Sequence, residues 1–292
     1  MVSIFSKHNL SLKSTRTYNP GVLFENEKHY LFYAADGKDG ISRIHRAVSR
    51  DGTNFEENRG LALSPSSEIE QRGLFDPRIT KIHNTYYLVY AAYDGDTPRL
   101  CLAISPDLEN WEKHGPMLEN WNFVKACGFL LPSSVSQMRS KNINDWSCAG
   151  AIFPKILKMK YWMLFGDRNI WMADSLNGKK WQANKAPLIS PRKNSFDSVR
   201  VEMGPPPIQT QRGWLVLYHG FDNKNISRPG IVWLDLQDPT KILYRSDKPI
   251  FAGLKKFFCN GALLSGDILK IYYGSNNTVA CMTEIKLNDL LA

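Results

Sequence analysis

The chain has 292 residues, of which 43% are hydrophobic and 12% aromatic, so it can bury a large core as one all-β domain or as two smaller domains. Its net charge of +9 would suit an acidic partner, but the Lys and Arg residues are dispersed and form no basic block of the kind that binds nucleic acid. Composition and charge therefore favour a globular protein without a nucleic-acid partner.

Targeting segments and metal-binding patterns are not evident. No run of about 18 apolar residues occurs, and residues 1–10 lack the apolar stretch of a signal peptide. We therefore expect a soluble, cytoplasmic protein with no membrane partner. The five cysteines are odd in number and lack the C-x-x-C spacing of zinc sites, which predicts reduced thiols and no bound metal. No glycine-rich phosphate loop is present, so we expect no cofactor.

A repeated unit is visible along the chain. Each copy begins with a polar residue next to Pro or Gly, continues with short apolar segments, and in the first three copies ends with a polar turn followed by an aromatic residue. The segments are 19–24, 30–33 and 44–49; 76–79, 86–90 and 100–105; 148–153, 161–165 and 170–175; 202–205, 214–220 and 231–234; and 260–264, 269–273 and 279–282. Repeats of this kind indicate one supersecondary unit used five times.

The heads of the five copies define the predicted fold. They are Asn19, Asp76, Ala149, Glu202 and Asn260, roughly 53 to 73 residues apart, about the length of one four-stranded propeller blade. Short segments rich in Tyr, Trp, Val and Ile, without a long helical period, predict an all-β fold. We therefore predict a single-domain, five-bladed β-propeller over residues 1–292, with the five heads converging on its central channel.

The longest interval between heads carries an inserted loop at about residues 121–146. This stretch is polar, with Ser133, Gln137 and Asn142 among its residues. It is interpreted either as a surface loop or as a lid from which Arg139 or Lys141 reaches a ligand.

Seven segments occur in an order that resembles a known family. They are Y-N-P-G at 18–21, S-R at 42–43 leading to S-R-D-G at 49–52, D-P-R-I at 76–79, F-P-K-I at 153–156, G-P-P-P-I at 204–208, G-W-L at 213–215 through Y-H-G at 218–220, and L-D-L at 234–236 with D-P at 238–239. Nearly the whole chain is thus similar to glycoside hydrolase family 130, the β-mannoside phosphorylases and hydrolases built on a five-bladed propeller. The resemblance implies an oligosaccharide substrate with a β-linked mannose.

Asp76 is the predicted general acid. Cleavage of a glycoside needs a proton for the leaving oxygen, and a carboxyl group at a channel mouth can supply it. In the family the aspartate of the D-P-R motif has this role and is thought to act through a hydroxyl of the bound mannose, which the resemblance transfers to Asp76. The alternative is that Asp76 only caps the turn before Pro77.

The residues near the G-P-P segment bear on what attacks the sugar. The phosphorylases hold inorganic phosphate, their co-substrate, with basic residues, and the resemblance implies Arg200 and His219 for this role. Arg168 or the inserted loop is a further candidate for binding phosphate. The family arginine that follows the third aromatic strand is replaced here by Gly166. The phosphate site therefore looks incomplete.

Glu202 stands where the phosphorylases have a small residue. A carboxylate there would repel phosphate and can activate a water, as the hydrolytic members of the family are thought to do. We therefore expect inverting hydrolysis, with Asp76 as acid and Glu202 as base, at the carboxyl separation of about 6.5–9.5 Å typical of inverting enzymes. The alternatives are a phosphorylase or mannosyltransferase using inorganic phosphate or mannose 1-phosphate, and a non-catalytic glycan-binding propeller. For Glu202 itself, the alternative is a salt bridge with Arg200.

The remaining predicted site residues contact the sugar. They are Asn19, Arg43, Arg78, Asn260 and Asn277. Asn277 stands where the family has an aspartate that contacts the sugar in the reactive subsite, and its amide can hydrogen-bond a hydroxyl without carrying charge. The sequence leaves open whether the linkage is β-1,2 or β-1,4, which sugar is the aglycone, and whether the protein is a homo-oligomer.

Overall fold

The structure is a computed structural model that describes residues 6–10, 12, 17–57, 60–119, 121, 147–251, 257–275 and 279–291. The inserted loop, apart from Trp121, and Asn277 lie outside the described residues. Within the described ranges the chain is almost entirely β-sheet, and its helical segments are the short 3-10 turns η1 (Glu68–Glu70) and η2 (Leu287–Leu291). The all-β prediction is confirmed. None of the helices in these ranges is long and apolar enough to cross a membrane.

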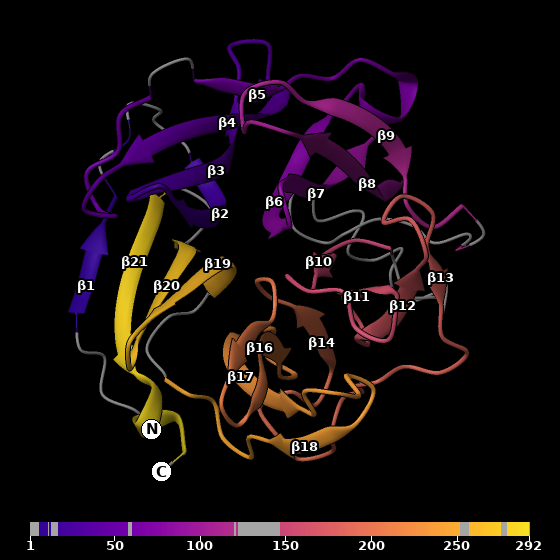
Figure 1. The fold of residues 1–292 in the computed structure, drawn as a ribbon, viewed down its shortest axis with the longest axis vertical. Helices are drawn as coiled ribbons and strands as arrows, with labels where there is room; N and C mark the ends of the chain where they lie inside the picture. Colours follow the sequence, from indigo (N-terminus) through magenta and orange to yellow (C-terminus); the bar gives the residue numbers. More distant parts are fainter. Residues whose placement is uncertain are drawn as a thin grey trace.

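The strands are arranged in groups around a centre (Figure 1). The first two groups are β2 (Thr17–Glu25), β3 (Lys28–Asp36), β4 (Ser42–Ser49) and β5 (Leu61–Leu63), then β6 (Gly73–Ile82), β7 (Thr85–Tyr93), β8 (Pro98–Ser105) and β9 (Glu112–Pro116). These two groups form one eight-stranded sheet, in which the strand pairing between them is a parallel bridge of Ser42 with Gly73. All other pairings within them are antiparallel.

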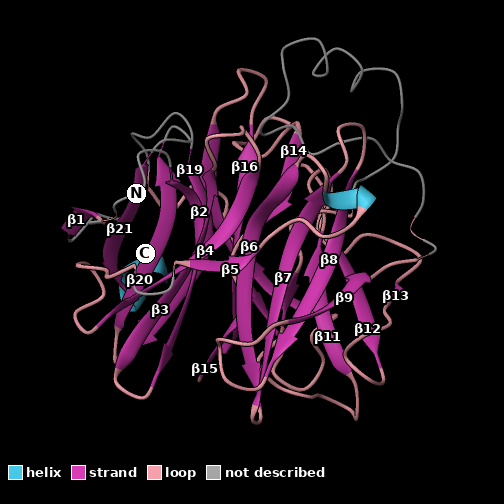
Figure 2. Cartoon of the chain, turned by 90° about the horizontal axis from the view of Figure 1, so that it is seen from above, coloured by secondary structure: helices cyan, strands magenta, loops and turns pink. Residues whose placement is uncertain are grey.

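The other groups form separate sheets. They are β10 (Ala151–Ile152), β11 (Tyr161–Phe165), β12 (Trp171–Ser175) and β13 (Gln182–Ala183); β14 (Arg200–Met203), β15 (Ile208–Thr210), β16 (Gly213–Phe221), β17 (Ser227–Leu234) and β18 (Ile242–Arg245); and β19 (Phe257–Ser265), β20 (Ile268–Ser275) and β21 (Val279–Lys286) with β1 (Ser6–Asn9). In Figure 1, β2, β6, β10, β14 and β19 lie nearest the centre. Figure 2 shows the strands running between two faces that carry the loops.

The sheet of β19 to β21 is completed from the other end of the chain. β1 pairs antiparallel with β21, in a register that places Asn9 opposite Cys281. The sequence analysis found no repeat segment before residue 18 and did not predict this strand. The pairing joins the first and last parts of the described chain, and β1 takes the place of β21 as the outer strand of this sheet.

Five hydrophobic clusters lie between neighbouring groups of strands. One cluster holds Phe32 with Leu88, another Tyr87 with Met163, and a third Phe153 with Trp214. A fourth cluster joins Leu217 to Ile271, and the fifth joins Tyr33 to Tyr272 across the closure. Each sheet is therefore covered on both faces, which explains why every residue of β16 is buried. This cyclic core supports our interpretation as five blades.

The closing turns of the first three units share one hydrogen-bond pattern. In each, a Ser at the strand end accepts from the backbone three residues later, and an Asp or Asn side chain two residues after the Ser accepts two further backbone amides. The first residues are Ser49, Ser105 and Ser175. The aromatic residues Phe55, Trp111 and Trp181 follow these turns and pack on the clusters between the groups. The predicted ending of these units is confirmed.

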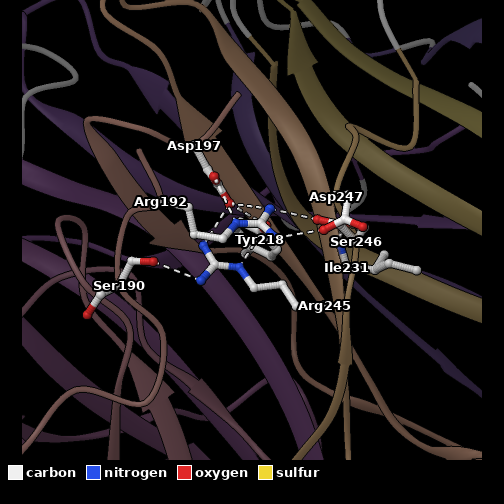
Figure 3. A network of polar contacts seen from close by, with 8 residues as sticks. All are labelled: Ser190, Arg192, Asp197, Tyr218, Ile231, Arg245, Ser246 and Asp247. Carbon is white, nitrogen blue, oxygen red and sulfur yellow. Dashed lines mark hydrogen bonds and ion pairs between the residues drawn. The ribbon is translucent and has the colours of Figure 1, made fainter. Parts of the chain in front are cut away.

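A buried carboxylate connects the outer strand β18 to the segment between β13 and β14 (Figure 3). Asp197 is fully buried and accepts hydrogen bonds from Arg192 at 2.9 Å, Arg245 at 2.7 Å and the Tyr218 hydroxyl at 2.8 Å. Arg192 also donates to the backbone oxygen of Ser246 at 2.7 Å. Because two guanidinium groups compensate one carboxylate, removing Asp197 would leave both without their charged partner.

Candidate active site

Three of the predicted heads have an uncommon backbone conformation. The φ angle is 53° at Asn19, 55° at Asp76 and 56° at Ala149, in the left-handed region that non-glycine residues seldom adopt. Asn19 and Asp76 lie at irregularities in the β2–β3 and β6–β7 pairings. Bulges re-aim side chains, and each such conformation costs about 1–3 kcal/mol. At Asn19 and Asp76 the two bulges therefore set the direction of the side chains.

The inner strands of neighbouring groups approach each other closely at these heads. A Cβ atom on Gly21 would lie 2.6 Å from the backbone oxygen of Pro77. Only glycine permits this approach, which explains the third residue of the N-P-G segment. The packing brings β2 against β6 and so places Asn19 beside Asp76.

Asp76 is held by a chain of amide hydrogen bonds from two other groups of strands. Asn19 Nδ2 donates to Asp76 Oδ1 at 2.5 Å, and Asn260 Nδ2 donates to the backbone oxygen of Asn19 at 3.2 Å. All three side chains are buried. Because Oδ1 accepts this hydrogen bond, a transferable proton on the carboxyl group would be carried by Oδ2.

Arg78 connects the strand of Asp76 to the strand of Glu202. Its guanidinium donates to the backbone oxygens of Gly204 at 2.7 Å, Met203 at 2.8 Å and Asp76 at 3.0 Å. The residue is only 1% exposed. Arg78 was predicted to contact the sugar, whereas these bonds give it a structural role between two inner strands.

Four side chains share one face of the β14–β16 pair. Arg200 lies opposite Phe221, and Glu202 lies opposite His219, in the antiparallel register. Residues two apart on a strand point to the same face, and directly opposite residues are cross-strand neighbours. The Arg200 guanidinium carbon lies 3.4 Å from the centre of the Phe221 ring. An arginine, a carboxyl group and a histidine are therefore gathered in one buried place.

Glu202 forms an ion pair with Arg200 but remains easy to protonate. Arg200 NH1 donates to Glu202 Oε2 at 2.9 Å, so the salt bridge considered as an alternative is present. Burial raises the pKa of Glu202 to about 7; Arg200 and Arg78 oppose this rise, while the charges of Asp167 and Asp76 add to it. The charge of Asp76 thus acts on Glu202, while the catalytic roles of these two carboxyl groups stay predictions.

His219 is a neutral, buried hydrogen-bond donor. Its Nε2 accepts from the backbone amide of Cys259 at 2.9 Å. Burial, with the charges of Arg78 and Arg200, holds the pKa of His219 well below its usual value, so the ring carries its one proton on Nδ1. Nδ1 is buried without a hydrogen-bond partner in the described part of the chain. A buried donor of this kind is costly unless a ligand satisfies it.

Two other predicted residues have local partners in the structure. Arg43 pairs with Asp39 through two hydrogen bonds, at 3.0 and 2.7 Å, and also donates to the backbone oxygen of Ile41. The Arg168 side chain is exposed, and its backbone oxygen accepts from the amide of Val201 at 3.0 Å. Among the described residues, no hydrogen bond or ion pair joins Arg43 or Arg168 to Asp76 or Glu202. Their roles at the sugar and the phosphate stay predictions, as does that of Asn277.

Asp167 belongs to the site although it was not among the predicted site residues. It is buried, its backbone oxygen accepts from Arg200 NH1 at 3.3 Å, and its charge acts on Glu202. Its position directly after an apolar aromatic strand was the available signal, but we chose the adjacent Arg168 because a basic residue suits phosphate. Among the described residues no group of three or more His, Cys, Asp or Glu side chains is placed to hold a metal ion.

Comparison with known proteins gives consistent matches. The family model described as beta-1,4-mannooligosaccharide phosphorylase matches residues 2–292. A 1,2-beta-oligomannan phosphorylase of Thermoanaerobacter sp. (strain X514) is 34% identical, over 94% of this chain and 90% of that protein. A beta-1,2-mannobiose phosphorylase of the same organism is 32% identical, over 89% and 87%.

A solved structure shows the same fold. Its description states that the GH130 family of mannoside phosphorylases contains glycoside hydrolases, and that these hydrolases target beta-1,2 mannosidic linkages in Candida mannan. It is 26% identical, covers 94% of this chain and 85% of that one, and has a TM-score of 0.78.

These comparisons correct one expectation. The two sequence relatives are named phosphorylases, and both are more similar to this chain than the hydrolase structure is. Our expectation of hydrolysis as the main reaction is therefore wrong, and phosphorolysis, its alternative, is favoured. The expectation of hydrolysis relied on the carboxylate of Glu202, whereas the similarity to the phosphorylases extends over most of the chain. The family itself agrees with the motifs, and the chain belongs to glycoside hydrolase family 130.

Proposed function

We propose that this protein is a β-mannoside phosphorylase that cleaves β-1,2-linked manno-oligosaccharides with inorganic phosphate. The observation that carries the proposal is the constellation of the buried Asp76 and His219 with the half-buried Arg200. It combines one carboxyl group, one guanidinium and one unpartnered N–H donor. The β-1,2 linkage is proposed because both sequence relatives are named for it.

The proposed reaction is a single displacement with inversion. Asp76 gives its proton, through a hydroxyl of the bound mannose, to the glycosidic oxygen as the bond from that oxygen to the anomeric carbon breaks. A phosphate oxygen attacks the same carbon from the opposite face. The products are a sugar shortened by one mannose and α-mannose 1-phosphate, because inversion converts a β-linked substrate into an α-linked product.

In this proposal the phosphate is bound by charge and by a neutral donor. Arg200 supplies a planar guanidinium, whose orientation is fixed by Phe221 and the backbone oxygen of Asp167. His219 Nδ1–H supplies a hydrogen bond without adding charge. Asn19 holds the acid, and Arg78 sets the separation between the strands of the acid and the phosphate site. We assign Asn260 a supporting role through Asn19.

We also propose a cytoplasmic location. Four cysteines, Cys101, Cys148, Cys259 and Cys281, are free and buried, which is typical of a reducing compartment.

Turnover of two mannobioses tests the proposed function. β-1,2- and β-1,4-mannobiose would be incubated with and without phosphate, and mannose 1-phosphate and mannose measured. We expect mannose 1-phosphate only with phosphate and mainly from the β-1,2 disaccharide. Equal cleavage of both disaccharides would refute the proposed linkage, and mannose release independent of phosphate would refute phosphorolysis.

A pair of arginine variants tests the phosphate site. Arg200→Gln removes a charge-assisted interaction worth about 1.5–3 kcal/mol, which corresponds to a rise in the KM for phosphate of roughly 10- to 150-fold. Arg212→Gln is the matched control, because Arg212 is exposed on the loop between β15 and β16. An unchanged KM for phosphate in Arg200→Gln would contradict the assignment.

A further inference from the structure

The candidate phosphate site contains a carboxyl group that the proposed reaction does not use. Glu202 is 2% exposed, ion-paired with Arg200, and the cross-strand neighbour of His219. An ionised carboxylate in this place would repel an incoming phosphate, and burial prevents water from screening the repulsion. Phosphate binding here therefore requires that the charge of Glu202 be removed.

The charges around Glu202 favour its neutralisation. Arg200 lies on its own strand, Asp76 and Arg78 lie on β6, Asp167 follows β11, and the neutral His219 faces it from β16. Three carboxyl groups thus share the site with two guanidinium groups. The Arg78 guanidinium is bound to backbone oxygens, so it compensates no carboxylate directly. When like charges share a buried site, a carboxyl group beyond the acid Asp76 is driven to take up a proton, and Glu202 is the buried one next to Arg200 and His219.

We propose that Glu202 binds phosphate as a neutral carboxylic acid, with its O–H donating a hydrogen bond to a phosphate oxygen, so that the protein takes up one proton for each phosphate bound. The proton comes from solvent and adds to the carboxylate, and no bond of the phosphate changes in this step. Arg200 then directs its charge to the phosphate and not to Glu202. This inference rests on the proposed phosphorylase function and adds a ligand to its phosphate site.

The inference predicts how phosphate affinity depends on pH. Only the protonated fraction of Glu202 is competent to bind, and the apparent dissociation constant is the intrinsic one divided by that fraction. With a pKa of about 7 for Glu202, affinity falls about eightfold between about pH 7.5 and about pH 8.5. Glu202→Gln carries a permanent N–H donor and no charge, so its affinity should not depend on pH over this range.

Sulfate binding measured by calorimetry separates the proton of the protein from that of the ligand. Phosphate itself gains and loses a proton near neutral pH, whereas sulfate stays a dianion. Heats would be measured at about pH 8 in two buffers of different ionisation enthalpy, which gives the number of protons taken up. We expect close to one proton per sulfate for the unmodified protein and none for Glu202→Gln. Glu68→Gln, on the exposed turn η1, is the matched control and should take up protons as the unmodified protein does.

Two outcomes would overturn the inference. The first is equal proton uptake by the unmodified protein and Glu202→Gln. The second is a sulfate affinity of the unmodified protein that does not change with pH. In both cases phosphate-dependent cleavage of mannobiose would still support the phosphorylase. Absence of anion binding at every pH, together with cleavage that needs no phosphate, would refute the phosphorylase and the inference together.

Discussion

Arg78→Lys should weaken both the fold and the catalytic step. The Arg78 guanidinium reaches the backbone oxygens of Asp76, Met203 and Gly204 at once, from two inner strands. A lysine ammonium keeps the charge but is compact, so it can satisfy one or two of these oxygens. Each lost bond to a charged donor costs about 1.5–3 kcal/mol, which gives a decrease of about 2–5 kcal/mol in the free energy of unfolding.

Denaturation and steady-state kinetics measure the two effects. A loss of this size should lower the melting temperature by roughly 4–20 °C, since about 2–4 °C is lost per kcal/mol in somewhat shorter proteins. A shift of Asp76 by about 1 Å relative to the phosphate site would lower kcat about 100-fold. Arg212→Lys, at an exposed loop position, is the control. A change in unfolding free energy below about 1 kcal/mol, with kcat within about twofold of the unmodified protein, would refute this reasoning.

Three further predictions concern single groups. Asp76→Asn keeps an oxygen that can accept from Asn19, so it should fold normally and lose roughly 100- to 10,000-fold in kcat; a smaller loss would mean that another group protonates the leaving oxygen. Burial alone would raise the pKa of Asp197, but hydrogen bonds from Arg192, Tyr218 and Ser195 and the charge of Arg245 hold this pKa below the usual value. The ionised Asp197 therefore stabilises the fold above about pH 4, and this contribution is lost as the pH falls further. Urea denaturation should therefore show Asp197→Asn to be less stable at neutral pH, with the difference shrinking in acid, whereas the exposed Asp247→Asn should match the unmodified protein; a difference independent of pH would contradict the ion-pair account. Burial raises the pKa of Cys101 to about 12, and the other three described cysteines are buried as well. A Cys127→Ser variant leaves only these four thiols, because Cys127 lies outside the described residues, so it should react with a thiol reagent only on unfolding. Rapid reaction of the native variant would contradict the burial of the four cysteines.

The repeated strands could be predicted because each is a local pattern of apolar and turn residues. The heads Asn19 and Asp76 were recognisable because Pro follows each of them, and their positive φ angles suit Asn and Asp. β1 could not be predicted, because its partner β21 lies at the other end of the chain and its own sequence is polar. The single-domain organisation and the inserted loop at about 121–146 stay predictions.

The site was predictable where residues share a strand and was not where strands from distant parts of the chain meet. Arg200 and Glu202 are two residues apart, so their ion pair followed from strand geometry. The partners of Arg78 at Met203 and Gly204 are more than a hundred residues away, and no local pattern announces them. The choice between Asp167 and Arg168 depended on how one turn directs adjacent side chains, which the sequence does not encode locally.

The most direct test of the proposed reaction is to follow β-1,2-mannobiose and phosphate by ³¹P NMR. The account predicts that α-mannose 1-phosphate appears as inorganic phosphate disappears, in equal amounts, and that no cleavage occurs when phosphate is omitted. Release of free mannose at the same rate with and without phosphate, and no new phosphorus signal, would contradict it.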